Sequence, residues 1–297
     1  MKAVSTILDH LFHTFLSEKT KEKCEKITVY IAISSFLLHL LLIGLIKLNW
    51  IPILINSQLL TNPISAIYTP FSFVIVYEVY LLLYYLPKST SIYIGKQYEI
   101  ISLIVIRRIF KDLSNLEITS NWFSVKNDLQ FTYDLIAIII LFWLIYYFYK
   151  LIKTNTIIAK NNTKSDIVGF IKLKRNIATC LVPVLLILSF YSLGHWLIES
   201  FFSVSNIVTG FKDINKIFFD DFFTILILVD VLLLIYSFLY SDQFNKVIRN
   251  SGFIISTILI KLSFSTTGLV NIALIIVAVL FGVIIFKIHN MFEKLDT

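Results

Sequence analysis

The chain has 297 residues, of which 57% are hydrophobic and 15% are charged, and its formal net charge is +7. A soluble domain is about 45–50% apolar and about 25% charged, so this composition excludes an ordinary soluble protein. Repeated apolar runs of about 18 residues or more instead indicate a polytopic α-helical membrane protein. The runs show no period-two alternation, which excludes a β-barrel.

The sequence contains no motif of a known catalytic chemistry. It has no phosphate-binding loop, glycine-rich dinucleotide motif, H-E-x-x-H helix or nucleophile elbow, and Cys24 and Cys180 make neither a disulfide framework nor a zinc pattern. We therefore expect no enzyme activity, no cofactor and no metal. The positive charge comes from lysines predicted to face the cytoplasm, where anionic lipid headgroups are the expected partner and nucleic acid is not.

The N-terminal segment, residues 1–26, is predicted to form an amphipathic helix followed by a solvated lysine-rich run. Leu8, Leu11, Phe12 and Phe15 recur at helical spacing, which is typical of a helix lying on the membrane or capping a bundle. The segment lacks the apolar core and cleavage site of a signal peptide. The first span is therefore expected to act as an uncleaved insertion signal.

Four membrane spans are predicted within residues 27–149. Between the first two, the stretch 47–63 is apolar but short and is broken by Pro52 and Pro63. It is predicted to be interfacial or re-entrant, with Trp50 near the headgroups. The four predicted spans are Ile27–Ile46, Ile64–Leu86, Ile92–Leu113 and Phe131–Tyr149.

A polar, basic cytoplasmic linker at residues 150–176 is predicted to separate these spans from four more within residues 177–297. One of the later spans is short, which is typical of a half-helix or a tilted partner, and the turn Ser265–Gly268 follows it. The four predicted spans are Ile177–Ile198, Ile217–Tyr240, Gly252–Phe264 and Leu269–Ile288.

The distribution of lysine and arginine predicts the orientation. With the N-terminus inside, 18 of the 26 basic residues fall in inside segments, 5 in outside segments and 3 within spans. The positive-inside rule therefore favours about eight spans with both termini in the cytoplasm. If Ile92–Leu113 only lay on the surface, the basic segment 150–176 would be external, so this charged stretch is predicted to cross.

The third span is unusual because charge at membrane depth costs several kcal/mol unless it is paired or hydrated. Glu99 is predicted to lie in the inner half of the membrane and Arg107 and Arg108 in the outer half. Two local pairs are predicted within this helix, since residues three or four apart share a face. These pairs are Lys96 with Glu99 and Arg108 with Asp112.

Arg107 and Lys111 share a different face of the same helix and need a partner from another span. Asp134, about one turn into the fourth span, is the predicted partner. Glu78 lies at mid-depth in the second span and is predicted to be near Glu99 in depth. Two carboxylates close together in lipid would disfavour ionisation of one of them.

Three interpretations of the third-span cations remain open at this point. Arg107, Arg108 and Lys111 can snorkel to the outer headgroups, form a purely structural bridge to Asp134, or take part in sensing or conduction. Glu78 has a shorter side chain that cannot snorkel as far, which favours a functional role for it.

Two more sets of ionisable residues lie within predicted spans. Asp230 and Lys261 are predicted to pair, either as a neutralised structural pair or as a gated pair in an ion path. His39 and His195 are candidates for a proton relay because histidine titrates near neutral pH. The alternative is that each histidine is a hydrogen-bonded structural residue.

The sequence predicts an all-α, multi-pass protein of the cell (inner) membrane and leaves two functions open. The first is a channel or transporter for a small ion or proton. The second is a non-conducting sensor, effector or scaffold whose buried charges are structural and whose segment 150–176 binds a cytoplasmic protein. A self-contained bundle and a homo-oligomeric ring with a shared pore are both compatible with the sequence. The candidate residues of the ion path or gate are Glu78, Glu99, Arg107, Arg108, Asp134, Asp230 and Lys261.

Overall fold

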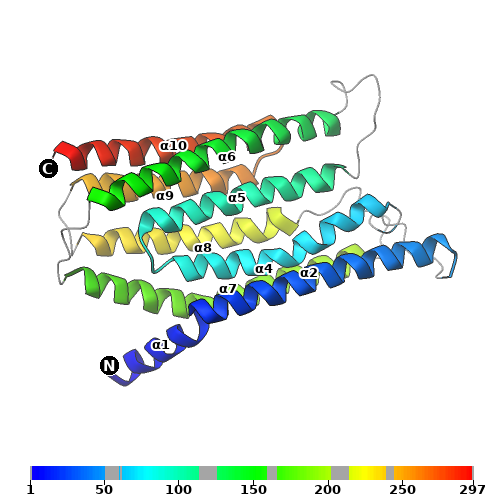
Figure 1. Ribbon diagram of the computed structural model, residues 1–297, viewed down its shortest axis with the longest axis horizontal. Coiled ribbons are helices and arrows are strands. Elements are labelled where there is room, and N and C mark those ends of the chain that lie inside the picture. Colours follow the sequence, from blue (N-terminus) through cyan, green and yellow to red (C-terminus); the bar gives the residue numbers. More distant parts are fainter. Residues whose placement is uncertain are drawn as a thin grey trace.

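The computed structural model describes residues 2–50, 60, 62–113, 126–158, 166–201, 214–238 and 244–295, and every regular element within them is helical. The long helices run along one axis of an elongated bundle, and the N- and C-termini lie at the same end (Figure 1). The elements are α1 (Lys2–Phe15), α2 (Glu18–Lys47), η1 (Pro63–Ile67), α4 (Tyr68–Tyr85), α5 (Thr90–Leu113), α6 (Lys126–Ile158), α7 (Asp166–Phe201), α8 (Ile214–Ser237), α9 (Phe244–Phe264) and α10 (Leu269–Leu295).

Six helical segments in the described part of the chain are long and apolar enough to cross a bilayer. This confirms the prediction of a multi-pass helical membrane protein. The other two long helices are α5, which carries the predicted charges, and α8. The six segments are Glu18–Lys47, Pro63–Tyr85, Asp128–Thr154, Gly169–His195, Phe244–Phe264 and Leu269–Leu295.

Several helices extend beyond the predicted apolar spans. Helix α6 continues to Ile158 and α7 begins at Asp166, so much of the segment predicted as a linker at 150–176 is helical. Helix α9 begins at Phe244 and has 21 residues, so the prediction of a half-helix is wrong. A helix needs no apolar residues where it leaves the membrane, and hydropathy therefore underestimates its length. The predicted re-entrant stretch falls mainly on residues 51–59, outside the described residues.

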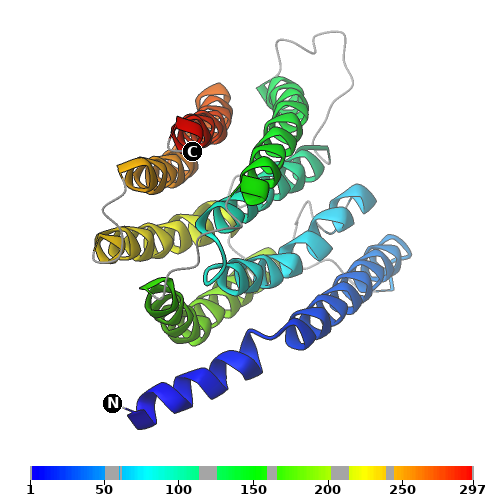
Figure 2. The same ribbon diagram turned by 60° about the vertical axis from the view of Figure 1, so that its left-hand side comes forward.

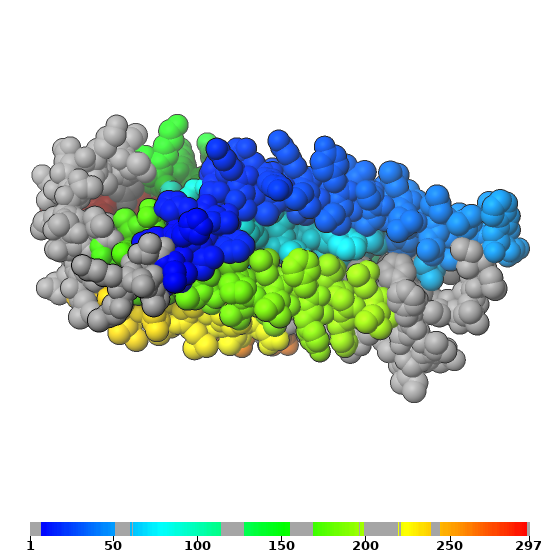
Figure 3. Space-filling model, turned by 90° about the horizontal axis from the view of Figure 1, so that it is seen from below, coloured from blue at the N-terminus to red at the C-terminus, as the bar shows by residue number. Residues whose placement is uncertain are grey.

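The N-terminal segment is helical, as the spacing of its apolar residues predicted. Helix α1 packs against α7, and the Arg175 guanidinium lies 5.1 Å from the centre of the Phe12 ring. The side chain of Ser17 caps the start of α2 by accepting a hydrogen bond from the backbone N–H of Thr20, at 3.2 Å. Seen from below, α1 lies at one end of the face that α2 and α7 form (Figure 3).

Helix α5 lies inside the bundle, where α4, α6 and α9 pack against it (Figure 2). Twelve of its 24 residues are buried. By contrast, only 17% of the apolar window of α2 is buried, and residues such as Tyr30 and Leu38 are more than half exposed. Exposed apolar side chains of this kind suit contact with lipid, whereas the charged helix is enclosed by protein.

The last two helices pack closely through small residues. Helix α9 ends at Phe264, and Gly268 adopts a φ of +69° in the turn that leads into α10. A left-handed residue at such a turn favours glycine because it has no Cβ. Farther along α10, a Cβ on Gly282 would collide with the hydroxyl of Tyr98, which is hydrogen bonded to Ser256 of α9. The turn predicted at Ser265–Gly268 is confirmed.

Candidate functional site

The side chain of Arg107 is fully buried and pairs with Glu78 of α4. Its Nη2 atom lies 2.7 Å from Oε1 and 2.6 Å from Oε2 of Glu78, and the two side chains are 0% and 2% exposed. The prediction that Arg107 pairs with Asp134 is therefore wrong, and so is the interpretation that it snorkels to the headgroups. Glu78 faces protein, and the guanidinium of Arg107 neutralises its charge.

Arg108 makes a bidentate ion pair with Asp134 of α6. Its Nε lies 2.5 Å from Oδ2 and its Nη2 lies 2.6 Å from Oδ1, while Nη1 donates to Oδ1 of Asn271 at 2.5 Å. Asn271 in turn donates to the backbone carbonyl of Ser263, at 2.6 Å. Snorkelling is wrong for Arg108 as well, because its donors are directed to protein acceptors.

Adjacent positions on α5 explain why the two arginines have different partners. Successive residues of an α-helix point about 100° apart around its axis, so Arg107 reaches α4 while Arg108 reaches α6 and α10. Asn271 then connects α10 to α9. We call this set the outer network; it joins five helices through Glu78, Arg107, Arg108, Asp134 and Asn271.

Glu99 is held separately, nearer the other end of α5. The Nζ atom of Lys96 lies 2.7 Å from Oε2, which confirms the predicted local pair, and the hydroxyl of Tyr149 donates to Oε1 at 2.5 Å. The Lys96 and Glu99 side chains remain 24% and 36% exposed. Glu78 and Glu99 thus have different partners, so neither carboxylate depends on the other.

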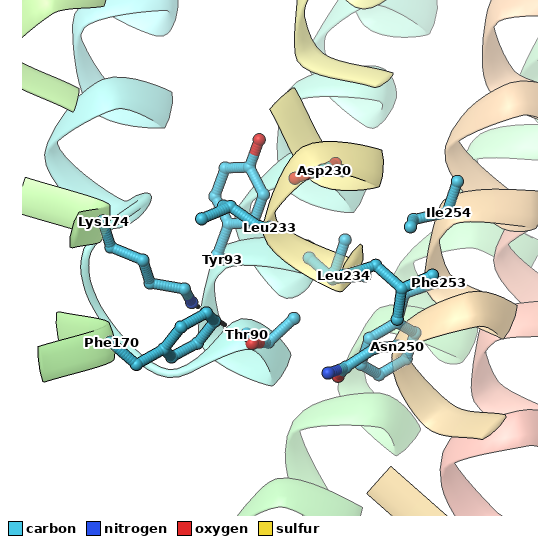
Figure 4. A pocket seen from close by; sticks show the side chains of 11 residues that line it. Thr90, Tyr93, Phe170, Lys174, Asp230, Leu233, Leu234, Asn250, Phe253 and Ile254 are labelled. Carbon is cyan, nitrogen blue, oxygen red and sulfur yellow. Dashed lines mark hydrogen bonds between the residues drawn. The ribbon is translucent and has the colours of Figure 1, made fainter. Parts of the chain in front are cut away.

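Asp230 does not form the predicted pair with Lys261. Both side chains belong to the described part of the chain, and the cation next to Asp230 is Lys174 of α7. The two residues line a cavity of about 30 Å³, which we call the inner cavity (Figure 4). Its lining residues are Thr90, Tyr93, Ile94, Phe170, Lys174, Asp230, Leu233, Leu234, Asn250, Phe253 and Ile254.

The polar groups at the inner cavity are incompletely bonded within the protein. Lys174 donates to the carbonyl of Lys88 at 3.2 Å and to Oγ1 of Thr90 at 3.3 Å. Three neighbouring buried atoms, in contrast, have no hydrogen bond of good geometry within the described residues: Oδ2 of Asp230, the hydroxyl of Tyr93 and Nε2 of Gln97. The Gln97 side chain is nevertheless close enough to interact with both Asp230 and Tyr93. Leaving a buried polar atom without a hydrogen bond costs about 1–3 kcal/mol. Three such atoms close together therefore suggest that another group, such as water, bonds to them.

No pattern in the sequence predicts this cavity. Lys174 was assigned to the linker because it follows a basic, polar segment, and Tyr93 and Gln97 carry no charge. A usable signal is the helical spacing of Phe170, Leu173 and Ile177, whose side chains pack against the core. That spacing extends the apolar stripe of α7 back past Lys174.

The two candidate relay histidines are neither residues of the outer network nor among those that line the inner cavity. His39 of α2 is buried, and its Nδ1 lies 2.6 Å from Oγ1 of Thr69. His195 of α7 is exposed, and its ring centre lies 6.3 Å from that of Tyr191. His39 therefore fits the alternative of a hydrogen-bonded structural residue. Within the described residues, no group of three His, Cys, Asp or Glu side chains is arranged to hold a metal ion.

The apolar helices and the charges between them define a multi-pass helical membrane protein. No protein-family model, curated protein or solved structure matches the chain. Its function is therefore inferred from the contacts of its own side chains.

Proposed function

We propose that this protein is a transporter or channel for a small ion or proton, with a path that follows α5. The observation that supports the proposal most strongly is the concentration of ionisable groups along this one enclosed helix and at its neighbours. Charged groups within a membrane are costly and commonly mark an ion or proton pathway. The inner cavity adds the buried carboxylate of Asp230, whose neighbouring cation is a lysine rather than an arginine.

In the proposed topology, the chain crosses the cell (inner) membrane eight times. Both termini lie in the cytoplasm. Two observations support it: the excess of lysine and arginine in the inside segments, and the position of both termini at one end of the bundle (Figure 1). An Asn161→Cys variant tests it. Labelling by a membrane-impermeant thiol reagent only after permeabilisation is expected, whereas labelling of intact cells would overturn the topology.

Reconstitution into liposomes tests the transport function. Purified protein is expected to move ions or protons faster than empty vesicles do, across a series of pH values and imposed voltages. Equal flux in both samples would overturn the proposal. Glu78→Gln and Asp230→Asn then separate the two polar sites. Loss of flux in Asp230→Asn, in protein that elutes like the wild type, assigns the path to the inner cavity.

The second candidate is a non-conducting sensor, effector or scaffold. The observation that favours it is the pairing of both carboxylates of the outer network, in which Glu78 and Asp134 each bind an arginine. Ion pairs of this kind specify which helices pack together. The same liposome experiment discriminates between the candidates, because a scaffold leaves the flux at the level of empty vesicles.

A further inference from the structure

We infer that the inner cavity is a proton-binding site, in which Asp230 accepts a proton through water that also contacts Lys174. This inference rests on the proposed transport function and names its substrate. Helices α5, α7 and α8 contribute Tyr93, Lys174 and Asp230 to the lining of this one pocket (Figure 4).

The hydrogen-bonding groups of the inner cavity are complementary through a shared water molecule. Oδ2 of Asp230 needs a donor, whereas the hydroxyl of Tyr93 and Nε2 of Gln97 need acceptors. A water molecule accepts from one group and donates to another, and it fits a cavity of about 10–15 Å³ or larger. The inner cavity measures about 30 Å³ and thus has room for one or two waters.

The charge of the lining favours a proton over a metal cation. A bound metal ion needs several oxygen ligands, but the oxygens without a partner are Oδ2 of Asp230 and the hydroxyl of Tyr93. Thr90 is already engaged by the ammonium of Lys174. That ammonium would also repel a metal cation. A proton needs only one acceptor atom and adds almost no volume.

Three neighbouring helices contribute polar or charged side chains near Asp230. Helix α5 contributes Tyr93 and Gln97, α7 contributes Lys174, and α9 contributes Asn250. The guanidinium of Arg249 repels the ammonium of Lys174 electrostatically. It also donates to Oδ1 of Asn250, from Nε at 3.2 Å and from Nη2 at 3.1 Å. Asp230 therefore faces one cation directly, the ammonium of Lys174.

The proposed step is a simple proton transfer without oxidation or reduction. A proton carried by water forms an O–H bond with Oδ2 of Asp230, and the ammonium of Lys174 keeps its three protons. The Asp230–Lys174 pair then changes from zero net charge to +1. Release of the proton to water restores the original pair. Lys174 is a positioning residue in this step, since it orders the water and sets how readily Asp230 takes up the proton.

Infrared difference spectroscopy tests the site without requiring transport. Lowering the pH of purified protein in lipid nanodiscs is expected to produce a carbonyl band of a protonated carboxylic acid that Asp230→Asn lacks. Asp221→Asn is the matched control because Asp221 is on the same helix and is exposed; it should retain the band. The same bands in wild type and Asp230→Asn would overturn the inference.

Proton flux into liposomes provides the second measurement. Removal of a positioned proton acceptor lowers the rate by roughly a hundredfold or more, so Asp230→Asn is expected to lose the flux while Asp230→Glu retains part of it. Lys174→Met is expected to shift the pH profile of the flux.

Measuring the flux of sodium, potassium and protons separately distinguishes a failure of the proton assignment from a failure of the transport proposal. If wild type carries sodium or potassium but no protons, the proton assignment fails and transport stands. If wild type carries nothing but the Asp230 band is present, transport fails and the proton site stands.

Discussion

The outer network and the inner cavity both place a carboxylate beside a cation in the interior of one bundle, yet they differ in how completely the carboxylate oxygens are hydrogen bonded. In the outer network, two guanidiniums are directed to two carboxylates and an amide at distances of 2.5–2.7 Å. At the inner cavity, the Asp230 carboxylate has an unbonded oxygen and a lysine nearby. This difference is the one expected if the outer charges hold helices together and the inner carboxylate, as proposed, takes up and releases a proton.

The choice of cation matches this division. Arginine keeps its charge at all physiological pH values and presents a planar fork that fits a carboxylate, whereas lysine is a compact ammonium whose charge responds to its surroundings. Arg107 and Arg108 therefore suit a permanent connection between helices. Lys174, which is 5% exposed, suits a site where protons are exchanged.

The largest effect is expected from Arg107→Leu, which would leave Glu78 buried without its guanidinium. Breaking a buried ion pair by removing one partner costs about 3–5 kcal/mol. The variant is expected to lose most of its folded yield, or to unfold at a much lower temperature in a detergent-based thermal assay. A thermal stability close to that of wild type would show that the outer network is not structural.

The double variant Glu78→Leu with Arg107→Leu is the control for this prediction. It removes both charges and leaves no unpaired group, and such replacements are often neutral or stabilising. Most of the lost stability should therefore return. A double variant as unstable as Arg107→Leu would attribute the loss to altered packing of the side chains rather than to the stranded charge.

Aspartate-to-asparagine substitutions compare the two regions directly. Asp134→Asn replaces a charged acceptor of a bidentate pair and is expected to cost about 1.5–3 kcal/mol, since hydrogen bonds to charged groups are worth that much. Asp230→Asn removes a carboxylate whose Oδ2 accepts no hydrogen bond within the described residues, and is therefore expected to cost less stability than Asp134→Asn. Thermal unfolding of both variants under the same conditions measures the difference. An equal loss in both would contradict the division into a bonded and an exchangeable site.

The existence of both regions could be predicted from the sequence only in part. Hydropathy and basic-residue counts predicted the helices and the enclosed, charged α5, and helical spacing predicted Lys96–Glu99 because both residues lie on one helix. Between helices, the predicted pairs Arg107–Asp134 and Asp230–Lys261 were wrong, whereas the alternative of a bridge from an arginine of α5 to Asp134 is observed for Arg108. Depth along the membrane was known from sequence position, but the order of helices around the bundle was not. Asp134 and Glu78 were therefore matched with the wrong neighbours, and Lys174 was missed because α7 extends beyond its apolar segment.

A smaller effect is expected where α9 and α10 pack closely between the two regions. Gly282→Ala would place a methyl group against Tyr98, whose side chain is buried and bonded to Ser256 at 2.8 Å. Overpacking of this kind costs about 1–3 kcal/mol, and thermal unfolding measures it. The control is Gly44→Ala, because a Cβ there meets no atom within 4 Å. It should be neutral or slightly stabilising, since alanine favours a helix by roughly 0.5–1 kcal/mol over glycine.

The smallest effect is expected from Lys96→Met, which removes the one ion pair of α5 that the sequence predicted correctly. This pair is partly exposed and joins residues three apart on one helix, and such pairs contribute about 0.2–0.5 kcal/mol. Glu99 would keep its hydrogen bond from the hydroxyl of Tyr149. Thermal unfolding should therefore barely change in Lys96→Met and should fall further in the double variant Lys96→Met with Tyr149→Phe, which leaves Glu99 without either donor. A large loss of thermal stability in Lys96→Met would mean that Glu99 depends on its cation as strongly as Glu78 does. The ion pairs of the outer network would then not differ in strength from the pair of Lys96 with Glu99.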